Sequence, residues 1–513
     1  MKKVDYKMKL FLIGILLSVC TLHAWGIEIP TSSQVGAVNM PVDIAPVQAP
    51  FDMVQFARPE FPNASISIVK TGARQGKLST KAIQKAIDEL SKKGGGTVIV
   101  PSGRWLTGRI TLKSHINLHL EEGAELHFSG EIEDYLPAVW TRNEGIELYS
   151  LGAMIYANGA NNIALTGKGK LFAPSKDSEV YQAHNIKDDI ESRIPDEYPL
   201  EERIYDGKDG QAIFLPMFFS PIACTNVLVE GVTFEQTIFW NVVPVYCDGV
   251  IIRGITVNSV GTPRGDGIDI DSSRNVLIEY STLDCGDDCF TIKAGRGDDG
   301  LRVNKPSENI VVRYCLAKRG PGGVTFGSET AGMIRNVYVY DCVFEHTHNG
   351  FYFKTRRSRG GGGEGLYFER IRLVSPMNVF RWDMLGSQRW VGDLAKRLPV
   401  RPVSPLTPLY RHISAKDIIV ENCDQLISAT GIPESPLSEV SIVNMKAKCK
   451  HFMRVQDVNG LVFANSFIQV ENPEAFILDG RNIMMINVKF NTPGEVLQAK
   501  YSGDLCRPII YNH

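Results

Sequence analysis

A short unit with strand-type alternation recurs along most of this chain, and it constrains the fold more than any other feature. Each copy begins at a polar or Gly anchor, continues with alternating apolar residues and ends in a Gly or polar turn. Anchor spacings from Asn226 onward are 23, 26, 34, 27 and 29 residues, and the last four anchors are 22, 21 and 22 apart. A period this short leaves no room for crossover helices, so the pattern predicts an all-β chain wound as a parallel β-helix. The anchors are Asn162, Asn226, Gly249, Asn275, Asn309, Asn336, Gly365, Asp417, Glu439, Gly460 and Asn482.

Stacking of successive coils has consequences for residues one period apart. Such residues should lie in adjacent coils, about 4.8 Å from each other. Cys315, Cys342 and Cys423 each follow their anchor by six residues, which predicts a ladder of inward-facing thiols. Nine cysteines follow residue 26, and this odd number spread along a long chain does not indicate a disulfide scaffold.

One helix is predicted before the repeats begin. Apolar residues at helical spacing follow the cap candidates Ser79 and Thr80, and Gly94, Gly95 and Gly96 end the pattern. We expect this helix to cap the N-terminal end of the solenoid, where an open strand edge needs cover. The apolar residues are Ile83, Ala86, Ile87 and Leu90.

Residues 1–26 have the pattern of a secretory signal peptide. A basic start precedes an apolar run from Leu10 to Val19, which is too short to span a bilayer, and small residues allow cleavage after Gly26. The mature protein is then expected to be secreted or periplasmic. Acylation of Cys20, which would give an outer-surface lipoprotein, is the alternative.

The rest of the chain divides into two parts. Residues 27–62 are rich in Pro and are expected to be an extended N-terminal segment, and residues 63–513 are expected to form a single catalytic β-helix domain. No stretch after residue 26 is apolar enough to span a membrane. The formal net charge is −2, so no basic excess exists to bind nucleic acid through its phosphates. We expect a monomer.

Three carboxylates are expected to share one patch of the solenoid. Asp266 lies in the stretch RGDGIDIDS, and Asp287 and Asp288 lie in GDDCFTIK, 21 residues after Asp266 and therefore about one coil away. Like charges that close cannot all ionise cheaply, so at least one pKa should rise, as general acid–base cleavage of a glycosidic bond requires. Capping of turns or Ca²⁺ binding by these residues is the alternative. Asp269 and Asp271 follow on one strand face and are expected either to bind substrate or to tune charge.

The chain resembles the polygalacturonase family, glycoside hydrolase family 28, from about Ile66 to Asn487. The motifs that carry the resemblance lie at 94–126, at 264–272 (RGDGIDIDS), at 286–296 (GDDCFTIKAGR) and at 322–329 (GGVTFGSE). The resemblance implies a right-handed parallel β-helix and an inverting hydrolase of pectic galacturonides that uses no metal and no cofactor.

The resemblance also implies residue roles. Asp287 would be the general acid, and Asp266 and Asp288 would hold and activate the attacking water. Stacked coils place these carboxylates close together, and by the separation rule for two carboxylates that closeness would indicate retention. We follow the family, because three carboxylates share the work here.

Two positions depart from the family pattern. Pro321-Gly322-Gly323 stands where the family has Gly-His-Gly, and Tyr352-Phe353-Lys354 stands where it has Arg-Ile-Lys. A guanidinium holds a carboxylate bidentately whereas Lys is a point charge, so the loss of the Arg favours a neutral sugar such as rhamnose next to the cleaved bond.

Replacements for the missing groups can be named from the sequence. Lys354, with Lys293, is expected to neutralise a substrate carboxylate, and Tyr352 is expected to contact the substrate. His348, or His346 beside it, is the candidate for the role of the missing His.

Basic and aromatic residues surround these motifs. Arg296 and the run Thr355 to Arg359 either form a cationic lip that attracts an anionic polysaccharide or belong to a solvated turn. Insertions at 173–215 and 375–412 interrupt the repeat and are expected to build the binding wall. Their aromatic residues Tyr205, Trp382 and Trp390 are candidates for stacking on sugar rings or for packing.

The sequence therefore predicts a secreted inverting hydrolase whose partner is a pectic polysaccharide or oligosaccharide. One alternative is a pectate-lyase-like enzyme, with Ca²⁺ held by the Asp cluster and Arg264 or Arg296 as the base. The other is a β-helix that binds carbohydrate without catalysis.

Overall fold

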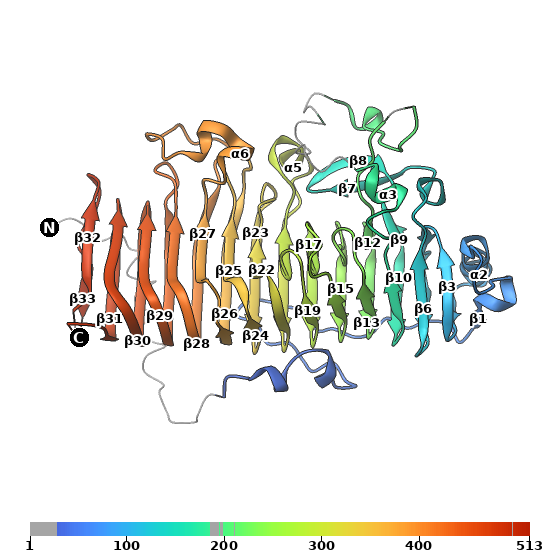
Figure 1. Ribbon diagram of the computed structural model, residues 1–513, viewed down its shortest axis with the longest axis horizontal. Helices are drawn as coiled ribbons and strands as arrows, with labels where there is room; N and C mark the ends of the chain where they lie inside the picture. Colours follow the sequence, from blue (N-terminus) through green and yellow to red (C-terminus); the bar gives the residue numbers. More distant parts are fainter. Residues whose placement is uncertain (1–27, 185–193, 195–197, 210, 495, 513) are drawn as a thin grey trace.

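The computed structural model describes residues 28–184, 194, 198–209, 211–494 and 496–512. They form a right-handed parallel β-helix in which each coil contributes strands to up to three faces, and equivalent strands stack along the axis (Figure 1). The predicted fold class is confirmed. The predicted signal peptide, residues 1–26, lies outside the described residues.

Three stacks of parallel strands make the faces of the solenoid. The first face contains β1 (Ser65–Ser67), β2 (Gly96–Val100), β5 (Ile116–Leu120), β10 (Asn161–Gly167), β13 (Thr225–Glu230), β15 (Asp248–Arg253), β18 (Arg274–Glu279), β21 (Ser307–Arg313), β23 (Ile334–Tyr340), β31 (Arg481–Asn491) and β33 (Ile510–Asn512). The second contains β3 (Gly103–Thr107), β6 (Ala124–Phe128), β11 (Lys170–Phe172), β14 (Thr233–Glu235), β16 (Thr256–Asn258), β19 (Thr282–Asp284) and β24 (Val343–Glu345). The third contains β4 (Ile110–Thr111), β9 (Ala153–Asn158), β12 (Met217–Ile222), β17 (Ile268–Asp271), β20 (Phe290–Lys293), β25 (Thr347–Lys354), β27 (Asn378–Asp383) and β32 (Gln498–Ser502).

Long strands and short helices complete the coils. The strands that run through two faces are β22 (Leu316–Phe326), β26 (Gly362–Val374) and β31, and those that run through all three are β28 (Leu409–Thr430), β29 (Leu437–Gln456) and β30 (Val458–Leu478). An antiparallel hairpin, β7 (Val139–Asn143) and β8 (Ile146–Ser150), stands outside the coils. The helices are α2 (Thr80–Lys92), α3 (Glu179–Gln182), α5 (Gly297–Val303) and α6 (Gln388–Val391), with 3-10 turns η1 (Ser32–Gln34), η2 (Ala37–Asn39), η3 (Ile68–Thr71), η4 (Ile132–Tyr135), η5 (Leu200–Glu202) and η6 (Gly392–Ala395).

The anchor of each repeat marks a left-handed corner of the backbone. Asn275, Asn309 and Asn336 have φ of 55°, 56° and 52°, a region that Asn tolerates better than most residues. Their side chains also stack, because Asn336 Nδ2 donates to Asn309 Oδ1 at 3.1 Å and Asn309 Nδ2 donates to Asn275 Oδ1 at 3.5 Å. The recurring Asn thus has a backbone reason and a ladder of hydrogen bonds.

One predicted anchor belongs to a different corner. Strand pairing aligns His412, not Asp417, with Gly365 and Glu439, and His412 has a φ of 53°. Asp417, with a φ of 57°, lies at the next left-handed corner of the same coil. Each of these coils has two such corners a few residues apart, and the sequence pattern around them is similar.

The predicted thiol ladder is therefore only partly right. Cys315 and Cys342 are buried immediately before the paired residues Leu316 and Val343. Cys423 is also buried, but it pairs with Cys449 in a separate stack. The nine cysteines of the described chain are free thiols.

Helix α2 lies at the N-terminal end of the solenoid, beside β1 and β3 (Figure 1). Its buried apolar residues, Ile83, Ala86, Ile87 and Leu90, join the interior of the first coils. No helix within the described ranges is long and apolar enough to cross a bilayer.

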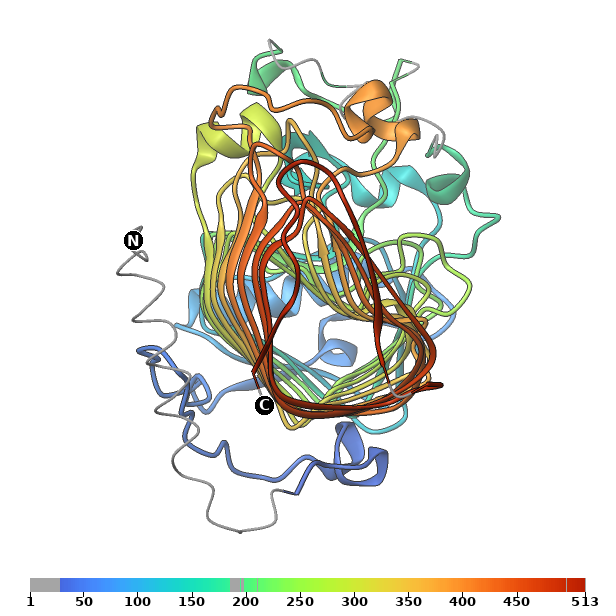
Figure 2. The same cartoon turned by 90° about the vertical axis from the view of Figure 1, so that its left-hand side faces the viewer.

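Residues 28–62 run along the outside of the coils, away from the insertions that project on the opposite side (Figures 1 and 2). An alternating charge ladder holds this segment. Arg253 and Arg313, both fully buried, each bond Glu279 and also donate to the segment, at 2.8 Å to the Pro41 carbonyl and 2.7 Å to the Ala45 carbonyl. The N-terminal segment is thus bound through backbone carbonyls.

Candidate active site

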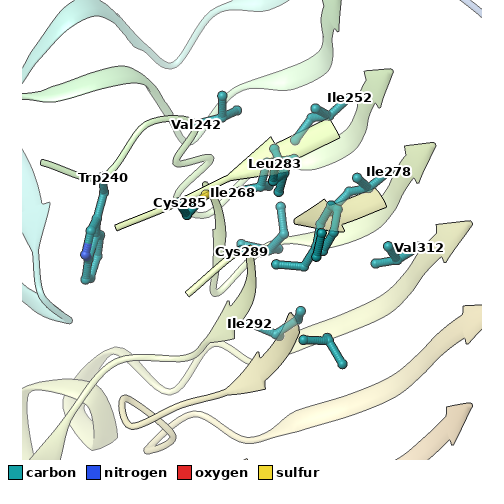
Figure 3. Close-up of a cluster of buried hydrophobic side chains, with 14 of the residues drawn as sticks. Trp240, Val242, Ile252, Ile268, Ile278, Leu283, Cys285, Cys289, Ile292 and Val312 are labelled. Carbon is teal, nitrogen blue, oxygen red and sulfur yellow. The ribbon is translucent and has the colours of Figure 1, made fainter. Parts of the chain in front are cut away.

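The third face carries the residues that the sequence singled out. Apolar residues of β17 and β20, such as Ile268 and Ile292, point into the buried cluster inside the coil (Figure 3). Strand alternation then directs Asp269 and Lys293 to the other face. Asp266 lies two residues before β17, and Asp287 and Asp288 lie three and two residues before β20, so the acidic residues sit where the backbone enters two adjacent strands.

The structure brings the three carboxylates together. One oxygen from each of Asp266, Asp287 and Asp288 lies within 4.8 Å of the other two. The local coil step is 22 residues rather than 21, because Ile268 pairs with Phe290 and the Gly267 amide donates to the Asp288 carbonyl. Asp288 is therefore the register partner of Asp266, and Asp287 lies beside that pair.

Burial and repulsion shift the titration of this cluster. Burial raises the pKa of Asp266 well above its ordinary value, and the charges of Asp269 and Asp287 raise it further against the opposing effect of Lys293. Burial also raises the pKa of Asp287, with help from Asp288 and opposition from Lys354. The pKa of Asp269 rises to about 7, mainly through burial, although Lys293 lowers it. Asp266, Asp269 and Asp287 therefore hold protons above the usual carboxylate range.

Lys293 is buried among carboxylates. Its Nζ lies 3.1 Å from Glu329 Oε2, 3.6 Å from Asp269 Oδ1 and 3.9 Å from Asp266 Oδ2, and it also lies 4.3 Å from the centre of the Trp240 ring. Burial alone would lower the pKa of Lys293, but these carboxylates raise it above the ordinary value. Lys293 is therefore already paired with carboxylates of the protein before any substrate binds.

Lys354 holds the third carboxylate. Its Nζ lies 2.5 Å from Asp288 Oδ2, so the two groups form an ion pair. Tyr352, two residues earlier on β25, lies between two cations, with Lys354 Nζ 5.2 Å and the Arg381 guanidinium 5.1 Å from its ring centre. The family's Arg position is thus occupied by an aromatic ring that contacts Lys354.

An open cleft of about 220 Å³ lies over this cluster. Asp266, Asp287, Lys293 and Lys354 line it, whereas Asp288 is completely buried behind them. Arg296, Arg356 and Arg359 also line it, so these predicted lip residues belong to the cleft. Six cations and four carboxylates line the cleft, which favours an anionic substrate.

Other predicted residues lie elsewhere. His348 and His346 are exposed and are not among the described residues that line the cleft. At Gly322, where the family has its His, a Cβ would lie 2.0 Å from Thr325 Oγ1 and 2.7 Å from Asp288 Oδ1, so these neighbours fill the place of a side chain. Asp269 and Asp271 are buried, and Asp271 pairs with Arg142, which makes them charge-tuning groups rather than substrate contacts.

The three aromatic candidates have different positions. Trp390 on α6 lines the cleft and is 36% exposed. Trp382 is buried in the core, with its ring stacked 4.7 Å from that of Phe353, and Tyr205 packs edge-on against Phe214 at 5.0 Å. Only the first of the three is placed to touch a sugar.

Glu144 and Glu329 were missed by the sequence analysis. Glu144, in the turn of the β7–β8 hairpin, bonds Arg264 at 2.6 Å and lies 3.4 Å from Arg296. Burial would raise the pKa of Glu329, but Lys293 and Arg296 hold it well below its ordinary value. Glu329 does end the motif GGVTFGSE, which could have drawn attention to it, whereas Glu144 has only a Glu-Gly hairpin turn as a signal.

A family model described as glycosyl hydrolases family 28 matches residues 206–378, the segment that contains all three clustered Asp residues and Lys354. The chain is 27% identical over 380 residues to a probable polygalacturonase of Vitis vinifera, covering 72% of this chain and 70% of that protein. The segment that contains the site thus matches glycosyl hydrolase family 28. The chain is a polygalacturonase-like glycoside hydrolase.

Two further similarities are to proteins described as exo-acting. An exo-poly-alpha-D-galacturonosidase of Dickeya chrysanthemi is 26% identical over 332 residues, which cover 60% of this chain and 55% of that protein. The crystal structure of a hyperthermoactive exopolygalacturonase from Thermotoga maritima aligns with a TM-score of 0.67 and 28% identity, covering 89% of this chain and 94% of that one.

The chemistry of the family 28 site follows from its charges. The Asp trio has the spacing of a cation site, but Lys354 and Lys293 already place ammonium groups against its oxygens. Arg264 and Arg296, the candidate bases of a lyase, both form ion pairs with Glu144. A carboxyl with a raised pKa beside an ionised carboxylate is suited to acid–base hydrolysis.

Proposed function

We propose that this protein is a secreted, inverting hydrolase of pectic polysaccharide or its oligosaccharides. Asp287 protonates the oxygen of the leaving sugar, and Asp288 with Asp266 takes a proton from the water that attacks the anomeric carbon. The observation that carries this assignment is the contrast within the trio: Asp287 lines the cleft with a raised pKa, while Asp288 is bonded to an ammonium group. Secretion rests on the pattern of residues 1–26.

The proposed inversion rests on the presence of three carboxylates, one that protonates the leaving oxygen and two that activate the attacking water. Asp288 lies in register with Asp266 behind the cleft, and both are near Asp287, so the site does not present the two isolated carboxylates of the separation rule. Proton NMR of the first product formed from an α-linked galacturonide distinguishes the two outcomes. A β-anomer supports the proposal, and an α-anomer identifies a retaining enzyme.

We further propose exo attack, in which one sugar at a time is removed from a chain end. The β7–β8 hairpin turn and α6 contribute Glu144 and Trp390 to the cleft from outside the coils, and such walls shorten a binding site. The similarity to two exo-acting proteins points the same way. Early appearance of monosaccharide without intermediate oligosaccharides supports exo attack, and a ladder of oligosaccharides contradicts it.

Product analysis on homogalacturonan and on rhamnogalacturonan oligosaccharides, side by side, tests the proposed function. Saturated products from either substrate support a hydrolase. Unsaturated products that absorb ultraviolet light, with activity lost to a chelator, would identify a lyase. Binding to either polysaccharide without turnover would identify a carbohydrate-binding protein.

A further inference from the structure

A continuous chain of ion pairs follows the wall of the cleft. Arg264 Nη1 lies 2.6 Å from Glu144, Glu144 lies 3.4 Å from Arg296, and Arg296 lies 2.8 Å from Glu329. Glu329 then contacts Lys293 at 3.1 Å, and Lys293 lies 3.9 Å from Asp266. The chain therefore begins at Arg264 and ends on one of the clustered Asp carboxylates.

Members of this chain differ in their access to a ligand. The side chain of Arg264 is 24% exposed, whereas those of Arg296 and Lys293 are each 4% exposed. Arg356 and Arg359, which also line the cleft, are buried. Among the guanidinium groups of the cleft, that of Arg264 is thus the one with the most surface to offer.

Arg264 is also held in a fixed orientation. Glu144 accepts from its Nη1, and a guanidinium can still grip a carboxylate bidentately along its Nε–Nη2 edge. Because Glu144 is shared between Arg264 and Arg296, one negative charge faces two positive charges. With six cations and four carboxylates in its lining, the cleft beside Arg264 keeps a positive excess.

The hairpin that carries Glu144 is itself fixed by close contacts. Gly145 has a φ of 84°, and a Cβ there would lie 2.9 Å from the Glu329 side chain and 3.1 Å from the Arg296 amide nitrogen. The preceding strand is anchored by Arg142, which is fully buried and donates to Asp271 at 3.1 Å and to Ser272 at 2.7 Å. Glu144 consequently has little freedom to move away from Arg264.

We propose that Arg264, positioned by Glu144, binds the carboxylate of a uronate in the cleft. This inference rests on the proposed function and names its substrate class: an acidic rather than a neutral sugar occupies the part of the cleft beside Arg264. Arg264, in the turn before β17, thereby takes the place of the guanidinium that the family has at the position of Tyr352. Arg264 is a specificity-determining residue, and Glu144 is a positioning residue.

The test compares oligogalacturonides that have free carboxylates with the same oligosaccharides as methyl esters. Esterification removes the charge and keeps nearly the same shape, so the ratio of the two kcat/KM values measures recognition of the carboxylate. The variants are Arg264→Gln, Arg264→Lys and Glu144→Gln. Arg319→Gln, at an exposed ion pair with Asp284, is the matched control.

Arg264→Gln is expected to lower kcat/KM on the free acid by about 10- to 100-fold, chiefly through KM, and to lower kcat/KM on the ester much less. Arg264→Lys should retain part of the preference, because a point charge replaces the planar fork. Glu144→Gln should lower the preference less than Arg264→Gln does and should also act through KM. Arg319→Gln should behave as wild type.

Two results would overturn the inference separately from the proposed function. Equal losses on acid and ester, or no loss on either, in an active Arg264→Gln variant would show that Arg264 does not read the carboxylate, while the hydrolase proposal stands. If Arg264→Gln does not unfold cooperatively, Arg264→Lys decides, and an unchanged acid-to-ester ratio overturns the inference. Absence of turnover of both substrates by the wild type would overturn the proposed function, and this inference with it.

Discussion

Lys354 Nζ lies 2.5 Å from Asp288 Oδ2, and this carboxylate is completely shielded from solvent. Burial opposes the charged form of Lys354, but Asp288 and Asp287 raise its pKa well above the ordinary value. The ion pair gives the buried Asp288 carboxylate a partner in a place where an isolated charge would be costly.

Lys354→Met should therefore lower kcat/KM on oligogalacturonides by about 100-fold, because Asp288, one of the groups proposed to activate the attacking water, loses its ammonium partner. The basic limb of the pH–rate profile should also move to higher pH, since Asp287, the proposed general acid, loses a nearby charge that lowers its pKa. Lys450→Met, at an exposed pair with Asp424, is the control and should leave both quantities unchanged. A normal profile for Lys354→Met would show that the pair does not support catalysis.

The raised pKa of Asp269 predicts how the free energy of unfolding depends on pH. Burial raises its pKa to about 7, so the folded protein binds this proton more tightly than the unfolded chain does. The corresponding stability is fully present below about pH 4, the unfolded value, and is lost as pH rises through about 7. Asp269→Asn resembles the protonated form. As pH increases over this range, the free energy of unfolding of the variant should rise relative to that of the wild type by on the order of 4 kcal/mol. Denaturant titrations at pH 4, 6 and 8 check this, and a difference that is constant with pH would contradict it.

Arg313 tests the attachment of the N-terminal segment. Its buried guanidinium bonds Glu279 and the Ala45 carbonyl, so Arg313→Met leaves a buried carboxylate with one fewer partner. We expect the free energy of unfolding to fall by about 3 kcal/mol. Arg319→Met removes an exposed ion pair and should leave the free energy of unfolding almost unchanged. Equal effects in the two variants would mean that the charge ladder does not hold the segment.

Trp390 and Trp382 should separate binding from stability. Trp390→Ala removes a partly exposed ring from the cleft and should raise KM by about 3- to 10-fold with little change in unfolding. Trp382→Ala leaves a cavity in the core and should lower the free energy of unfolding by about 3–5 kcal/mol with KM unchanged in the folded fraction. An unaltered KM for Trp390→Ala would exclude this ring from substrate binding.

Much of the solenoid could be predicted because its repeat has a local cause. An Asn at a left-handed corner, such as Asn275 or Asn336, is required by its own backbone, and the apolar alternation after it is required by the adjacent strand. Asp417 shows the limit of this reasoning, because two corners in one coil carry similar residues and only the strand pairing separates them. The error at Cys423 follows from that single shift.

The candidate site likewise has residues that the sequence repeat brings together and residues that it does not reveal. Asp266 and the pair Asp287-Asp288 come together because one coil separates them, which a sequence period can reveal. Glu144 reaches the same cleft from a hairpin 120 residues before Arg264, outside the repeat, so no period points to it. His348 resembled a replacement for a missing side chain by its position in the sequence, but it lies on the surface and not in the cleft.

The most direct test of the account is the activity of Asp287→Asn on oligogalacturonides, measured beside Asp424→Asn, which alters an exposed carboxylate. Loss of the general acid should lower kcat by about 10²- to 10⁴-fold with KM and the unfolding curve close to those of wild type. The control should retain full activity. A folded Asp287→Asn enzyme that hydrolyses its substrate at nearly the wild-type rate would contradict the assignment of catalysis to the three clustered carboxylates.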